Sequence, residues 1–193
     1  MERVKTPTRQ HQWLQTLAIF GHPTILWTSD APLRHRLFIG SYANAVKPPE
    51  DVSLIVNCTV SWPFSCVRPA LFLRLPMCDG DKDAFVPTFC SVMLVCKRIR
   101  FTLRHRGGCL IHCLFGASRS VFLSLFVLLY HCGQSITESM VWREYFAVQA
   151  KRKYINVRLG YLRAVYCMIK YEFPRCVEIQ LTNGIEESGK EKA

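Results

Sequence analysis

The chain has 193 residues, half of them hydrophobic, with ten cysteines and a formal net charge of +11. This composition fits one domain with short extensions, and no apolar run is long enough to span a membrane. The cysteines are scattered through apolar runs without a Cys-x2-Cys pair, and the chain shows no secretory signal, so zinc ribbons and secreted disulfide frameworks are excluded. We therefore expect reduced thiols and an intracellular protein, cytoplasmic, nuclear or both.

Residues 1–32 form a predicted N-terminal extension. Four apolar residues there fall at helical spacing, which favours a short amphipathic segment packed on the domain. A poorly ordered extension is the alternative. Beyond it, three runs rich in apolar residues predict strands, the first of which leads into a short helix from Tyr42 to Ala45. These strands are Leu37–Ser41, Val52–Val60 and Ala70–Pro76.

Helices dominate the second half of the chain. The segment from Phe85 to Arg106 has apolar residues at helical spacing and a basic end, and two glycines follow it. The run from Ser118 to His131 is apolar nearly all round, which predicts a buried central helix. The remaining predicted segments are a helix that begins with a capping box at 135–138 and ends near Lys151, a last helix over 159–173, and a polar tail over 176–193.

Strands alternating with helices predict an α/β fold for residues 33–175, a single domain with a mostly parallel central sheet flanked by helices. Ligands of such sheets bind at the carboxyl ends of the strands. A buried strand, Cys109–His112, ends there and is followed by a small-residue loop and the central helix. Backbone N–H groups and the helix dipole make such a loop an anion site. Cys113 and Arg119 at its two ends add a nucleophile and a bidentate cation.

The sequence His112-Cys113-x5-Arg119-Ser120 resembles the signature of the cysteine-based protein tyrosine phosphatases. Its ending, Gly116 to Ser120, is similar to the dual-specificity branch, of the small atypical kind. The match is specific, because four fixed residue types at fixed spacing fall at a predicted strand–loop–helix junction. The resemblance covers about residues 33 to 173. It implies a protein tyrosine phosphatase-like fold, with a dual-specificity catalytic domain at 33–175 that needs neither metal nor cofactor.

The resemblance also implies roles in a two-step hydrolysis through a phosphocysteine. Cys113 is the thiolate nucleophile and Arg119 binds the equatorial phosphate oxygens. Ser120 helps the cysteine to leave, while His112 orients the loop and supports the thiolate through hydrogen bonds. Substrate phosphate is bound by the loop and its backbone N–H groups, at Leu114, Phe115, Gly116, Ala117, Ser118 and Arg119.

The general acid that protonates the leaving oxygen is an aspartate in this family, on a loop after a strand. Asp79 comes directly after the third predicted strand and is the first choice; Asp81 is second and Asp83 third. Their spacing also occurs in calcium-binding loops, but the glycine and the glutamate that such a loop requires are absent. We therefore predict no metal here.

The chain departs from the family pattern at two places. Leu114 and Phe115 are bulkier than the small residues that often follow the cysteine, and Phe115 is expected to narrow the pocket rim or make it apolar. The segment after Arg152 lacks the Pro-Asn pair of the family. The asparagine that braces the signature loop is thus either missing here or displaced to Asn156, and we expect a less rigid loop.

The many thiols suggest one further hypothesis. Cys58 lies at the end of a predicted core strand and is a candidate to form a protective disulfide with oxidised Cys113.

The expected function is hydrolysis of phosphotyrosine and phosphoserine/threonine monoesters in a phosphoprotein substrate. A phosphatase of a non-protein phosphate, such as a phosphoinositide, a glucan or an RNA 5′-end, is one alternative; the loop has no lysines to favour a polyanionic lipid headgroup. A pseudophosphatase that only binds phosphoproteins is the other, but Cys113 and Arg119 are both present. Nucleic acid is not favoured, because aromatic residues are not expected to interleave with the basic clusters. The oligomeric state is not predicted.

Overall fold

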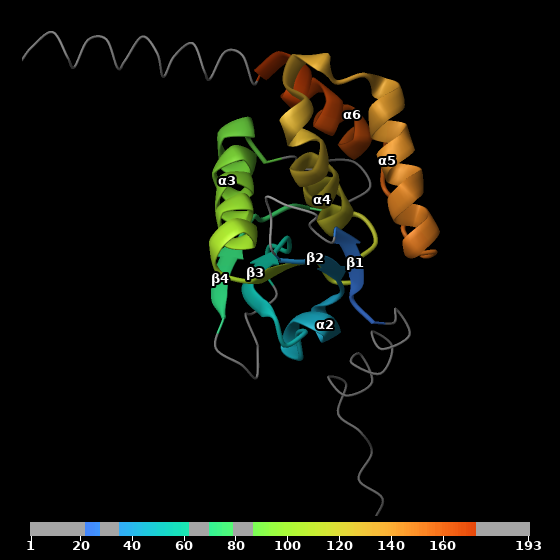
Figure 1. Ribbon diagram of the computed structural model, residues 1–193. Helices are drawn as coiled ribbons and strands as arrows, with labels where there is room; N and C mark the ends of the chain where they lie inside the picture. The colour runs from blue at the N-terminus through green and yellow to red at the C-terminus, as the bar shows by residue number, and fades with distance from the viewer. Residues whose placement is uncertain (1–21, 28–34, 62–69, 79–86, 173–193) are drawn as a thin grey trace, which may run out of the picture.

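Five strands form one sheet in the computed structural model, which describes residues 22–27, 35–61, 70–78 and 87–172 (Figure 1). Their order across the sheet is β1-β2-β5-β3-β4. The four strands from β2 to β4 in this order are parallel, and only β1 pairs antiparallel, with β2. The predicted mostly parallel sheet is therefore confirmed. The strands are β1 Thr24–Trp27, β2 Leu37–Gly40, β3 Val52–Asn57, β4 Leu71–Arg74 and β5 Gly108–His112.

Strand β1 was not predicted, because it comes from the segment assigned to the N-terminal extension. It has four residues and lies at the edge of the sheet, where it pairs with β2 through a register shift between Ile25 and Trp27. So short a strand shows no clear two-residue periodicity. Its pairing with β2, rather than its own sequence, places it in the sheet.

Helices cover both faces of the sheet. Figure 1 shows α3, α4, α5 and α6 on one face and the short α2 on the other. No helix among the described residues is long and apolar enough to cross a membrane. The helices are α2 Tyr42–Val46, α3 Phe89–His105, α4 Arg119–Leu129, α5 Glu138–Lys151 and α6 Leu159–Cys167, with a 3₁₀ segment η1 at Tyr130–Ser135 and a π-helical segment η2 at Met168–Glu172.

The central elements of the domain are β5 and α4. All five residues of β5 are buried, since strands flank it on both sides and helices cover both its faces. Helix α4 is buried nearly all round, as its apolar sequence predicts. Phe122 packs on Tyr161 of α6 with ring centroids 5.3 Å apart, and Phe126 packs on Phe89 of α3. Burying each large apolar side chain stabilises the fold by about 1.5–3 kcal/mol. Packing of this kind fixes where α4 begins.

The predicted capping box at 135–138 is wrong. Ser135 is the last residue of η1, and the N-cap of α5 is Thr137, whose side-chain oxygen accepts a hydrogen bond from the Met140 N–H at 3.3 Å. Ile136 between them is buried and extended. Burial of this isoleucine decides the start of the helix, and the local Ser-x-x-Glu pattern does not.

Candidate active site

The loop between β5 and α4 is tied to the strands on either side of it. The N–H of Cys58, just after β3, donates to the carbonyl oxygen of His112 at 2.8 Å. On the other side, the N–H of Tyr42, at the start of α2, donates to the carbonyl oxygen of Leu114 at 3.1 Å. The loop thus starts at the carboxyl edge of the central strands, where the sequence places the ligand site.

Gly116 is required by the close approach of the loop to β2. Its φ is +70°, and a Cβ at this position would lie 2.5 Å from the carbonyl oxygen of Gly40 and 2.7 Å from a guanidinium nitrogen of Arg152. No other residue fits this combination of positive φ and contact without movement of the backbone. The tight curl that Gly116 permits directs its N–H toward the sulfur of Cys113, 3.2 Å away.

The sulfur of Cys113 lies in a site built to hold negative charge. Its side chain is buried, and burial alone would raise the pKa of the thiol. The hydrogen bond with the Ser120 hydroxyl (Sγ to Oγ 3.3 Å), the positive charge of Arg119 and the N–H groups of Ser120 and Ala117 outweigh this effect and lower the pKa. Cys113 therefore has enhanced thiolate character.

The imidazole of His112 acts on the backbone of the loop. Its Nδ1–H donates to the carbonyl oxygen of Cys113 at 3.3 Å, and its ring lies 6.2 Å from the ring of Tyr42. Burial lowers the pKa of His112 to about 4, and the charge of Arg74 acts in the same direction. The ring is therefore neutral at physiological pH. His112 thus contacts the peptide that carries the sulfur, and its orienting role stays a prediction.

Arg119, the first residue of α4, lies between the cysteine and the chain that follows β4. One of its Nη atoms donates to the carbonyl oxygen of Met77 at 3.4 Å. The hydroxyl of Tyr161 in α6 donates to the carbonyl oxygen of Cys78, the next residue, at 2.7 Å. The segment that enters the predicted acid loop is thus anchored beside the guanidinium of Arg119. Asp79, Asp81 and Asp83 themselves lie outside the described residues.

A buried arginine, Arg152, braces the loop through two of its carbonyl oxygens. Nε and one Nη of Arg152 donate to the carbonyl oxygens of Gly116 and Phe115, at 2.9 and 3.2 Å. Its other Nη reaches β1, where it donates to the hydroxyl of Thr24 and the carbonyl of His22. Only 6% of the Arg152 surface is exposed. One planar guanidinium therefore joins the loop to the edge of the sheet.

The side chain of Asn156 is not what braces the loop in the structure. Asn156 contacts the loop through its backbone N–H, which donates to the carbonyl oxygen of Ala117 at 2.9 Å. Any residue except proline could make this bond. The side-chain brace comes from Arg152. Arg152 stands at the start of the same sequence segment, but the sequence does not show which atoms it contacts.

The other loop residues differ in burial, and the expected position of Phe115 at the pocket rim stays a prediction. Leu114, Phe115 and Ala117 are half-buried, while Ser118, the N-cap of α4, is buried. Cys58 behind the loop is a free, fully buried thiol. Burial raises the pKa of Cys58, and the negative charge of Cys113 raises it further. Cys58 therefore stays a neutral thiol beside the reactive one, and its disulfide with Cys113 stays a prediction.

No protein-family model and no curated protein matches the chain. Among solved structures, a variant of human DUSP28 is similar, with a TM-score of 0.60 and 21% identity over 80% of this chain and 98% of that one. OH1 from the Orf virus, a tyrosine phosphatase with triple substrate specificity, gives 0.59 and 18% over 82% and 96%. PTPMT1 in complex with PI(5)P gives 0.53 and 18% over 72% and 94%. The chain therefore has the fold of cysteine-based protein tyrosine phosphatases, as predicted.

The hydrogen bond from Ser120 can be tested through the reactivity of Cys113. Ser120→Ala removes the hydroxyl that stabilises the thiolate, so the pKa of Cys113 should rise. Below that pKa, alkylation of Cys113 by iodoacetamide should slow by roughly tenfold, since a hydrogen bond to a charged group contributes about 1.5–3 kcal/mol. Mass spectrometry of the labelled peptide over a pH series measures this. Ser124→Ala is the control, because its hydroxyl donates to the Ser120 carbonyl and not to the sulfur; equal effects of the two changes would refute the assignment.

The brace from Arg152 gives a second prediction. Arg152→Ala leaves two loop carbonyls without their donors, which should lower the free energy of unfolding by about 2–3 kcal/mol. Loss of loop geometry should also weaken binding of tungstate by roughly tenfold or more. Urea denaturation and isothermal titration measure the two effects. Lys153→Ala, an exposed neighbour, should change neither; undiminished tungstate binding by folded Arg152→Ala protein would show that the loop holds its shape without the brace.

Proposed function

We propose that this chain is a dual-specificity protein phosphatase that hydrolyses phosphotyrosine and phosphoserine/threonine monoesters through a phosphocysteine intermediate. The observation that carries the proposal is the buried sulfur of Cys113, whose pKa is lowered by Ser120, by Arg119 and by backbone N–H groups of the same loop. A thiolate held inside an anion-binding loop is the arrangement that attack on a phosphate monoester requires. The fold supports the same class of reaction, phosphoric monoester hydrolysis.

In the first step the thiolate of Cys113 attacks phosphorus. The sulfur–phosphorus bond forms as the bond to the ester oxygen breaks, and the phosphate oxygens are held by the loop N–H groups and by the guanidinium of Arg119. The departing oxygen takes a proton from an aspartic acid. Asp79 is the first choice, because Cys78 directly before it is tied to Tyr161 and Met77 is tied to Arg119. Both bonds bring the start of this segment to the site.

In the second step water attacks the phosphocysteine and releases inorganic phosphate. The leaving group is now the sulfur of Cys113, and the Ser120 hydroxyl, 3.3 Å from it, stabilises the emerging thiolate. The aspartate, deprotonated in the first step, accepts the proton of the water. His112 stays neutral through the cycle, because burial holds its pKa at about 4.

The protein substrate is supported by the loop of the site. Leu114 and Phe115 are half-buried apolar residues of the loop itself, and they suit the aryl ring or alkyl chain of a phosphorylated residue better than the polar face of a sugar. A phosphoinositide is the second candidate, because PTPMT1 was solved in complex with PI(5)P. A phosphoprotein-binding module without turnover is the third. A thiolate nucleophile persists only in a reducing compartment, which supports an intracellular location.

Turnover of a substrate panel tests the function. Phosphotyrosine and phosphoserine/threonine peptides should be hydrolysed faster than soluble phosphoinositides or RNA with a 5′-phosphate. Cys113→Ser should lower turnover by at least about 10³-fold, because the hydroxyl of serine is not ionised at neutral pH. The matched control is Cys90→Ser at an exposed cysteine, which should behave as the wild type. Full turnover by Cys113→Ser protein would exclude the covalent mechanism, and preference for a lipid or RNA substrate would replace the proposed one.

The general acid is tested separately. Asp79→Ala should lower kcat for phosphopeptides by about 10²-fold or more, while tungstate affinity stays near that of the wild type, because a general acid acts only on the leaving oxygen. An aryl phosphate with a more acidic leaving phenol should lose less. Asp83→Ala is the control and should keep its rate. An unchanged rate in Asp79→Ala together with a loss in Asp81→Ala would move the role to Asp81.

A further inference from the structure

The outward face of α3 carries a group of basic residues that the proposed reaction does not use. Its exposed positions recur at intervals of three and four residues, so they share one side of the helix. The face includes two exposed apolar side chains, Leu94 and Phe101, with 72% and 43% of their surface accessible. We call this surface the basic face; it consists of Leu94, Lys97, Arg98, Phe101, Arg104 and Arg106, all exposed.

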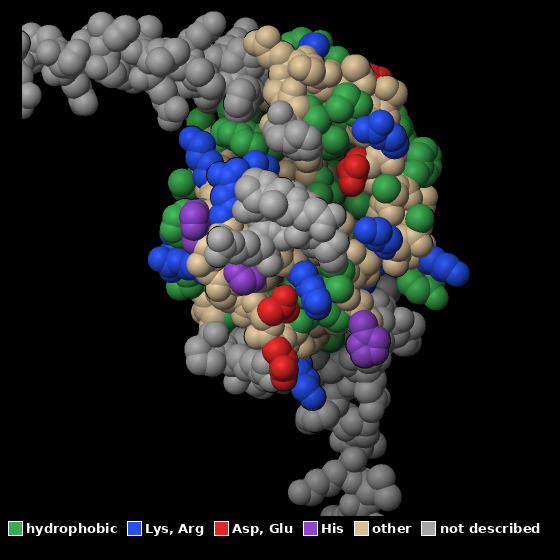
Figure 2. Space-filling view, in the orientation of Figure 1, with side chains coloured by type: hydrophobic (Ala, Val, Ile, Leu, Met, Phe, Trp, Pro, Cys, Tyr) green, Lys and Arg blue, Asp and Glu red, His purple; other side chains and the backbone are tan. Residues whose placement is uncertain are grey.

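No acidic residue compensates this charge nearby in sequence. Between residues 87 and 137, which include α3, β5 and α4, the chain has no aspartate or glutamate. Figure 2 shows lysine and arginine side chains gathered on the side of the molecule where α3 lies. The acidic residues of the described ranges are Glu50 and Asp51 before β3, Glu138 and Glu144 in α5, and Glu172 in η2. Of these, Asp51 contacts Gly108, which follows the end of α3, and none lies on the basic face itself. The basic face therefore presents a positive potential to a partner.

The surroundings of Phe101 bear on whether the anionic partner is a nucleic acid. The guanidinium groups of Arg98 and Arg106 lie over its ring at 5.8 and 5.5 Å from the centroid, and the ring of His105 lies 4.9 Å away. An aromatic residue does interleave with the basic cluster, so that sequence expectation is wrong. Phe101 is, however, the single aromatic residue of the basic face, whereas single-stranded nucleic acid is bound on a series of stacking side chains. The face does not favour single-stranded nucleic acid.

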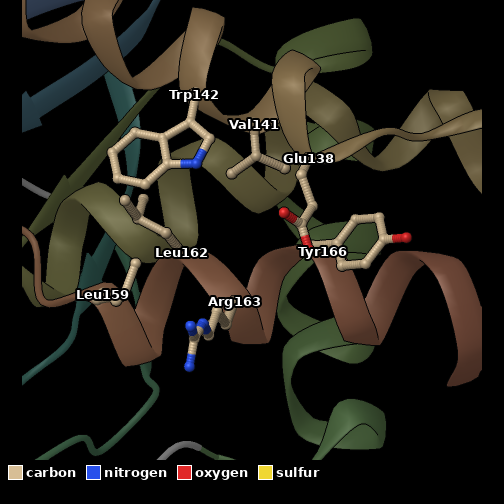
Figure 3. Close-up of a pocket in the computed structure, with 7 residues that line it drawn as sticks. All are labelled: Glu138, Val141, Trp142, Leu159, Leu162, Arg163 and Tyr166. Carbon is tan, nitrogen blue, oxygen red and sulfur yellow. The ribbon is translucent and has the colours of Figure 1, made fainter.

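The shape of the face disfavours a peptide. Two hollows of the described structure lie elsewhere. One is a cavity of about 180 Å³ between α5 and α6, lined by Trp142 and Leu159 among others (Figure 3), and the other is lined by residues 35–51. Neither is lined by α3. A peptide is commonly bound in a groove, whereas an amphipathic helix face with cations and apolar side chains is typical of a helix that lies on a flat anionic surface.

We propose that the basic face docks on an anionic phospholipid bilayer. Lys97, Arg98, Arg104 and Arg106 pair with lipid headgroups, and Leu94 and Phe101 enter the interface between headgroups and acyl chains. Each basic residue near such a surface strengthens binding by about fivefold. A few residues on one rigid helix thus provide reversible attachment without a membrane span.

This proposal does not rest on the proposed function. Helix α3 joins the amino end of β5 through two residues, and Cys113 follows its carboxyl end. All six residues of the basic face are exposed, whereas Cys113 is buried. Changes on the outward face of α3 should therefore leave hydrolysis of a small soluble aryl phosphate unchanged, so that docking and catalysis can be measured one at a time.

Co-sedimentation of the full chain with phospholipid vesicles tests the docking. The protein should bind phosphatidylcholine vesicles that contain phosphatidylserine, should not bind pure phosphatidylcholine vesicles, and should be released as salt is raised. The triple variant Lys97→Gln/Arg98→Gln/Arg104→Gln should bind about 100-fold more weakly. The control Arg143→Gln/Lys153→Gln/Arg163→Gln removes the same net charge from exposed positions outside α3. It should keep an affinity within about threefold of the wild type, because exposed charges far from the surface are screened.

The apolar contribution is tested with Phe101→Ala, which keeps the charge and should bind several-fold more weakly. Circular dichroism spectra confirm that each variant is folded. Equal loss in the two triple variants would show that net charge alone drives binding and would overturn the proposal. Absence of binding to phosphatidylserine would also overturn it, as would binding of poly-glutamate or poly-uridine RNA in place of the vesicles.

Discussion

The candidate site depends on keeping negative charge on a buried sulfur. Burial opposes ionisation of Cys113, so every other feature of the loop must counteract it. The Ser120 hydroxyl, the charge of Arg119 and the N–H groups of the loop all do so, within one turn of the start of α4. An anion site of this kind needs its donors fixed before the ligand arrives, because reorganising them would consume the binding energy.

The scaffold provides that rigidity from three directions. The central strand β5 delivers Cys113 to the edge of the sheet, and buried α4 holds the first helical turn in place. Gly116 allows the loop to touch β2, and Arg152 joins the back of the loop to the edge strand β1. The edge strand β1 therefore supports the site, although it is far from Cys113 in the sequence. This explains why a chain without the family's Pro-Asn pair still closes its loop.

The helices that cover the sheet differ in what they expose. Helices α4, α5 and α6 bury their apolar sides against each other, and the sulfur-bearing loop is enclosed beneath α4. Helix α3 buries its apolar side in the same core and exposes its basic side (Figure 2). The candidate site and the basic face thus lie on different elements of the domain.

The sequence by itself determined the order of most elements, the parallel sheet and the identity of the reactive loop. These depend on local signals, namely apolar strands, a helix apolar all round, and a cysteine and an arginine at fixed spacing. Only the tertiary structure decided that β1 joins the sheet, that Thr137 caps α5, that Arg152 braces the loop, and that Arg98 and Arg106 cover Phe101. Each of these four depends on a contact between residues, and a one-dimensional pattern does not record the packing that selects among possible partners.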